Sequence, residues 1–97
     1  MTDQQISDMG LSAQQVLDNP AFSEALQRLQ KLAFDAYKRT DIRDAEGLKL
    51  ARQFQAVTDD FEQILRRMVE GGRLAHLNLE KHRSESAAKR MLRSVIR

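Results

Sequence analysis

Apolar residues recur at alternating spacings of four and three along two segments of the chain. The first segment contains Phe22, Leu26, Leu29, Ala33 and Ala36. The second contains Leu50, Phe54, Val57, Phe61, Ile64 and Met68. Residues three and four apart lie on the same side of an α-helix, so each series predicts a helix with a narrow apolar seam. A seam of this width matches the side of one partner helix, as in a coiled coil or a helical hairpin.

Capping residues mark where these two helices begin. Asn19 is a preferred N-cap and Pro20 is favoured at the first helical position, so the first helix is expected at about residues 20–39. Residues 40–44 have the composition of a tight connection, and a link of two to five residues joins antiparallel helices. The second helix is expected to run to about Glu70. The predicted fold class is therefore all-α, with an antiparallel, coiled-coil-like helical hairpin over residues 19–70.

The segments that flank the hairpin are less regular. Residues 1–18 are mostly polar and are expected to form an N-terminal arm, with at most a short helical turn over residues 13–17. Gly71-Gly72 leaves two outcomes open, because paired glycines often end a helix while the apolar spacing continues from Met68 to Gly71 and Ala75. Residues 71–97 are expected to form a basic, amphipathic helical extension that frays or turns at residues 84–86.

Charge is distributed unevenly along the chain. Residues 1–80 carry ten Lys and Arg against thirteen Asp and Glu, whereas residues 81–97 carry six Lys and Arg against one Glu. This basic end is compatible with docking on an acidic protein, contact with nucleic-acid phosphates, binding to a membrane surface, or a solvated helix that completes the bundle. The candidate partner-binding residues are Lys81, Arg83, Lys89, Arg90, Met91, Arg93, Val95 and Arg97.

The sequence contains no recognisable catalytic or metal-binding pattern. There is no Cys, and His76 and His82 are six residues apart, whereas metal-binding pairs on a helix need a spacing of three or four. We therefore expect a non-enzymatic protein without a cofactor. No apolar run approaches the length of about 20 residues that a membrane-spanning helix needs. Because a chain of 97 residues in slender helices buries a small core, we expect homo-oligomerisation through the seams.

Three segments carry a resemblance to a known group of proteins. They are Asn19-Pro20-Ala21-Phe22 with Glu24-Ala25-Leu26, then Asp44-Ala45-Glu46-Gly47, and Glu70-Gly71-Gly72-Arg73-Leu74-Ala75. Over residues 19–77 the chain resembles small, mostly uncharacterised proteins of tailed bacteriophages, encoded among head and packaging genes. It departs from them in having no Trp and in its longer basic C-terminus.

The resemblance brings no catalytic residues to this chain. It implies a phage structural or assembly protein that docks a capsid, portal or assembly component. The corresponding location is the host cytoplasm during infection or the virion itself. The alternatives are a DNA-binding packaging protein of the small-terminase kind and a phage inhibitor of a host defence system.

Overall fold

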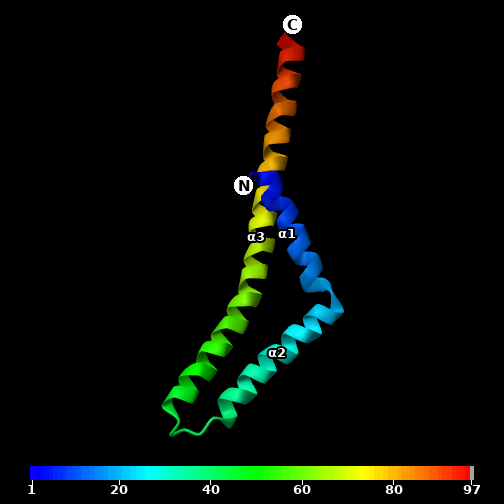
Figure 1. Cartoon of the computed structure of the whole chain (residues 1–97). Helices are drawn as coiled ribbons and strands as arrows, with labels where there is room; N and C mark the ends of the chain where they lie inside the picture. The colour runs from blue at the N-terminus through cyan, green and yellow to red at the C-terminus, as the bar shows by residue number, and fades with distance from the viewer. Residues whose placement is uncertain (97) are drawn as a thin grey trace.

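The computed structural model describes residues 1–96, and this range contains three α-helices and no strand. They are α1 (Asp3–Asp18), α2 (Pro20–Arg39) and α3 (Ala45–Ile96). α3 alone has 52 residues, or about 78 Å at 1.5 Å per residue, and it sets the longest dimension of a molecule that measures 81 × 27 × 16 Å. α1 and α2 follow each other along one side of α3 and run antiparallel to it (Figure 1). The predicted all-α helical hairpin is confirmed.

The hairpin begins and turns where the capping residues indicated. The side chain of Asn19 accepts a hydrogen bond of 3.1 Å from the backbone N–H of Phe22, and Pro20 is the first residue of α2. At the other end of the hairpin, the side chain of Asp44 accepts a hydrogen bond of 2.9 Å from the backbone N–H of Gly47. Each bond satisfies a backbone donor that the first turn of a helix leaves unpaired. These local interactions set the start of α2 and the start of α3.

The N-terminal segment is a helix, so the expectation of a polar arm over residues 1–18 is wrong. Thr2 caps α1 through a reciprocal pair of hydrogen bonds with Gln5, which is a capping box. The residues of α1 that are buried are Ser7, Gly10 and Ala13, spaced three apart. They are too small to stand out as an apolar seam, yet their size allows a close approach to α3.

α3 continues through Gly71-Gly72, so of the two outcomes left open the structure shows continuation of the helix and not its end. Gly72 is buried at the crossing with α1, where a Cβ atom added to it would lie 2.7 Å from the Cα atom of Gly10. The missing side chain thus serves the close contact between two helices. The expected turn at residues 84–86 is also wrong, because the helix runs without interruption to Ile96. A Ser costs only a few tenths of a kcal/mol in a helix, and the flanking Ala and Lys residues favour the helical state.

The core of the single chain is thin. Its buried apolar residues are four alanines and Leu26, and no large side chain within residues 1–95 is fully buried. The Cα radius of gyration is 22.2 Å, compared with about 12.5 Å for a compact domain of this length. The accessible surface is 8006 Å², compared with about 5,700 Å² for a compact monomer of this mass. The chain therefore leaves much of its apolar surface uncovered.

Candidate functional site: an exposed apolar face and the free end of α3

The predicted seam of α3 is not the surface that α3 turns towards α2. The residues on that side are the buried Ala51 and Thr58 and the half-buried Gln55, Glu62 and Leu65. Each of these residues comes directly after a seam residue in the sequence. Consecutive residues are about 100° apart around a helix, so the seam points about 100° away from α2. Most of the α3 seam therefore lies beside the contact between α2 and α3 and not within it. Small and polar residues let α2 approach α3 closely, and the large apolar residues are turned to one side.

The individual seam residues consequently differ in exposure. Leu26 is buried, and Phe22 and Met68 are half-buried. The other predicted seam residues are between 38% and 64% exposed, and they are Leu29, Leu50, Phe54, Val57, Phe61 and Ile64. As the seam of an oligomer these residues remain a prediction that the single chain does not test.

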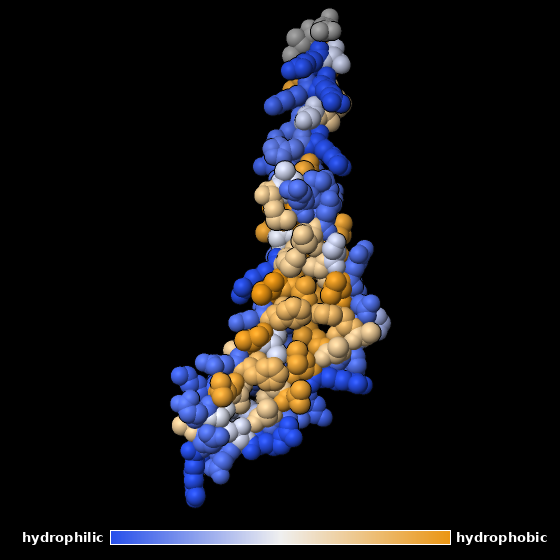
Figure 2. All heavy atoms as spheres, viewed as in Figure 1, coloured by the Kyte–Doolittle hydropathy of each residue, from blue (hydrophilic) through white to orange (hydrophobic). Residues whose placement is uncertain are grey.

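The exposed seam residues belong to one continuous surface across α2 and α3. We call it the apolar face, and it consists of Leu29, Leu32, Leu50, Phe54, Val57, Phe61 and Ile64. Phe22 and Phe61 join the two helices at this surface, with ring centroids 6.2 Å apart and planes tilted by 48°. Figure 2 shows apolar side chains gathered across the middle of the molecule on one side.

The apolar face continues towards α1. Ile6 and Met9 of α1 line a groove of about 430 Å³ together with Ile64 and Met68 of α3. Leu11 lies in a different groove, which Val69 and His76 of α3 also line. The two grooves flank the contact between α1 and α3, so Leu11 lies on the other side of the molecule from Ile64. This placement makes Leu11 an exposed apolar residue outside the apolar face.

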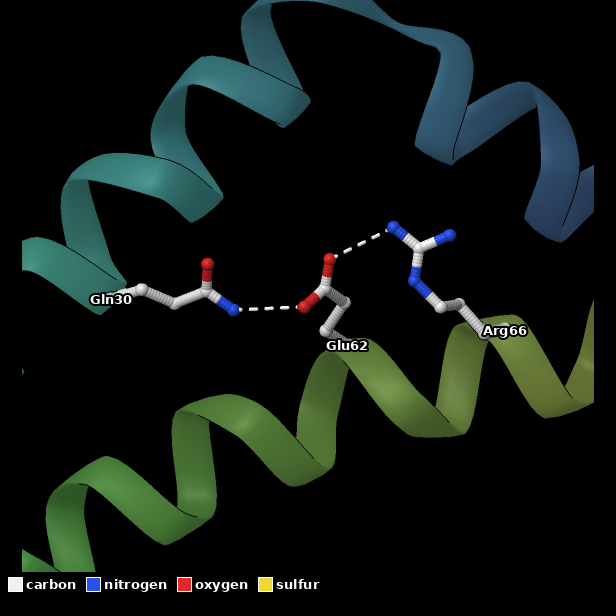
Figure 3. Close-up of polar contacts among 3 residues, drawn as sticks. All are labelled: Gln30, Glu62 and Arg66. Carbon is white, nitrogen blue, oxygen red and sulfur yellow. Dashed lines mark hydrogen bonds and ion pairs between the residues drawn. The ribbon is translucent and has the colours of Figure 1, made fainter.

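Polar side chains bridge α2 and α3 near the bend between α1 and α2 (Figure 3). The side-chain amide of Gln30 donates a hydrogen bond of 3.0 Å to one carboxylate oxygen of Glu62, and Arg66 donates one of 3.0 Å to the other. The hydrogen bonds from Gln30 and Arg66 lower the pKa of the Glu62 carboxyl from its ordinary value. Both oxygens of the carboxylate have partners, and the bond from Gln30 links α2 to α3.

A cavity of about 350 Å³ lies at this bend and is lined by apolar and polar residues, among them Leu17, Leu26, Gln30 and Glu62. Within residues 1–96 no three His, Asp or Glu side chains converge as metal ligands would. The Nε2 atom of His76 lies 3.1 Å from the Oε1 atom of Glu80, and both side chains are exposed.

The last part of α3 extends beyond the other helices. We call residues 80–96 the free end of α3; residues 80–95 are exposed, and the segment is about 25 Å long. The candidate partner-binding residues on it are Lys81, Arg83, Lys89, Arg90, Met91, Arg93 and Val95, whereas Arg97 lies outside the described residues. Spacings of seven and three place Arg83, Arg90 and Arg93 on one side of the helix, away from Met91 and Val95. The free end is therefore amphipathic, as predicted from the sequence.

No family model matches the chain, and no curated protein or solved structure is significantly similar to it. Among the helices of residues 1–96, none has a stretch that is long and apolar enough to cross a membrane. The geometry thus offers two surfaces for contact with other molecules: the apolar face and the free end of α3.

Proposed function

We propose that this chain is a non-enzymatic interaction protein that self-associates through its apolar face and docks a larger partner through the free end of α3. The observation that carries the proposal is the apolar face itself. Its residues are between 38% and 64% exposed in the single chain, including two Phe side chains. An exposed apolar patch of several hundred Å² often marks an interaction site.

The free end supports the docking part of the proposal. It is a regular helix that contacts neither α1 nor α2, so its basic side and its apolar side are both open to a partner. The resemblance to tailed-phage proteins supplies the setting: a virion or assembly component as the partner, such as a capsid or portal protein. The proposed locations are accordingly the host cytoplasm during infection and the virion.

One observation favours a second candidate function, which is a DNA-binding packaging protein. Arg83, Arg90 and Arg93 lie on one side of an exposed helix, where they are able to contact successive phosphates. Binding of this kind weakens steeply with salt because each neutralised phosphate releases counterions. A gel-shift titration with duplex DNA at increasing salt concentration measures this dependence.

Two sets of substitutions separate protein docking from DNA binding. Replacing Arg83 and Arg90 with Glu reverses charge on the basic side, and replacing Met91 and Val95 with Asp removes the apolar side. If the apolar side docks a protein, the partner that copurifies with the natural chain from infected cells should be absent, by mass spectrometry, when the Met91 and Val95 variant is purified. Retention of the same partner by a chain truncated after Glu80 would reject docking through the free end. Loss of gel shift only with the Arg83 and Arg90 variant would support the DNA-binding alternative.

A further inference from the structure

We infer that the apolar face is covered by the same face of a second copy, which gives a closed dimer with twofold symmetry. This inference rests on the self-association in the proposed function and adds its geometry and stoichiometry.

The area of the apolar face matches one half of a stable interface. A fully covered Phe buries about 150–250 Å², and an aliphatic side chain buries somewhat less, so seven side chains that are roughly half-exposed present about 500–600 Å². A standard interface buries about 800 Å² on each partner, including its polar rim. The apolar face is therefore large enough to form the centre of an interface by itself.

The position of the apolar face favours a closed dimer. In the hairpin this face occupies one side of α2 and α3, while the cluster of Gln30, Glu62 and Arg66 lies between the helices beside a largely polar cavity. A ring or filament needs two different complementary patches on each chain, whereas a twofold dimer uses one patch that meets itself. The apolar face gathers seven exposed large side chains on one side of the hairpin. A patch of this kind, meeting the same patch of a second copy, gives two copies packed face to face.

This dimer leaves the free ends of α3 uncovered. Ile64 is the last α3 residue in the defined apolar face, and residues 80–95 lie beyond the body of each chain. Each dimer consequently presents two free ends. Two linked weak contacts bind a repetitive partner far more tightly than one contact does, because the second contact forms at a high effective concentration.

Val57 is the residue best placed to report the twofold axis. It is the middle member of the α3 residues in the apolar face, and the axis of a self-complementary contact passes close to the centre of the patch. Val57 is 64% exposed, so the folded single chain tolerates a substitution there. Leu11 is 63% exposed but lies outside the apolar face, which makes it a matched control.

The test is cross-linking of single-cysteine variants, because the natural chain contains no Cys. The variants Val57→Cys and Leu11→Cys are treated with a bismaleimide that spans about 10 Å, the distance between packed helix axes. We expect Val57→Cys to give cross-linked dimers, and no larger species, roughly tenfold or more faster than Leu11→Cys, because an interface raises the effective thiol concentration. Equal rates for the two variants would overturn the inference.

A second pair of variants keeps the inference testable without cross-linking. Val57→Asp should give a folded monomer by light scattering and circular dichroism, because a charge in the interface has no partner there. Leu11→Asp should remain a dimer. A Val57→Asp variant with the mass of the natural oligomer, or a natural oligomer larger than a dimer, would contradict the twofold contact. Docking through the free end is tested separately, because the monomeric Val57→Asp variant keeps residues 81–97 and should still capture the larger partner, whereas the natural dimer truncated after Glu80 should not.

Discussion

The crossing of α1 and α3 gives the most quantitative prediction. Gly71 and Gly72 are adjacent in α3, but only Gly72 lacks room for a side chain. A Cβ atom on Gly72 would lie 2.7 Å from the Cα atom of Gly10 and 3.1 Å from the carbonyl oxygen of Ile6. These are backbone atoms, so the two helices must move apart by at least 0.7 Å to restore the 3.4 Å of ordinary van der Waals contact. A Cβ atom on Gly71 would meet only the side chain of Ile6, at 3.9 Å.

The substitutions Gly71→Ala and Gly72→Ala therefore isolate the cost of the clash. Both replace Gly by Ala inside the same helix, and each gains about 1 kcal/mol of helix propensity. Only Gly72→Ala also forces two packed helices apart, and overpacking of this kind costs about 1–3 kcal/mol. We expect Gly71→Ala to be more stable than the natural protein, and Gly72→Ala to be less stable than Gly71→Ala by about 1–3 kcal/mol.

Denaturation followed by far-ultraviolet circular dichroism measures this difference. For a domain of this size, 1 kcal/mol shifts the melting temperature by about 4–8 °C, so the two variants should be clearly resolved. All samples must have the same protein concentration, because self-association couples to unfolding. The reasoning about the crossing is refuted if Gly72→Ala is as stable as Gly71→Ala.

Three further predictions concern the hairpin and the free end. Gln30 and Arg66 lower the pKa of Glu62, so its carboxylate stabilises the fold fully above about pH 4.5 and progressively less as the pH falls through the lowered pKa. Acid titration of Glu62→Gln should therefore show a smaller loss of stability than the natural protein, and an equal loss would argue against this role. Asn19→Ala should cost about 1 kcal/mol in urea denaturation through the lost cap of α2, whereas Asn78→Ala in an exposed part of α3 should not destabilise. Truncation after Glu80 should leave the melting temperature unchanged, since residues 81–95 are all exposed; a clear decrease would contradict the description of the free end.

The parts of the fold that local chemistry controls were predictable from the sequence. Asn19 with Pro20, and Asp44 after a short polar link, are signals that act within one helical turn, and α2 and α3 begin where these signals lie. α1 was missed because its contact with α3 depends on small residues, which apolar spacing does not detect. A local signal was nevertheless present, since Thr2 and Gln5 form the capping box that starts α1.

The direction of the apolar seam could not be predicted from spacing alone. Spacing shows that Leu50 to Met68 share one side of a helix, but it does not show which side a second helix covers. In the structure α2 covers the neighbouring side, where Ala51 and Thr58 permit a close approach and Gln30 forms a hydrogen bond with Glu62. The contacts with α2 thus determine which side of α3 is covered. They leave the seam exposed as the candidate surface for a second copy.

Sedimentation equilibrium of the natural protein at tens of micromolar tests the central claim most directly. The mass of one chain is 11.1 kDa. If the apolar face is a contact between two copies, the measured mass should be twice that of one chain and should fall towards the single-chain value as the protein is diluted. A mass of one chain throughout this concentration range would contradict the account.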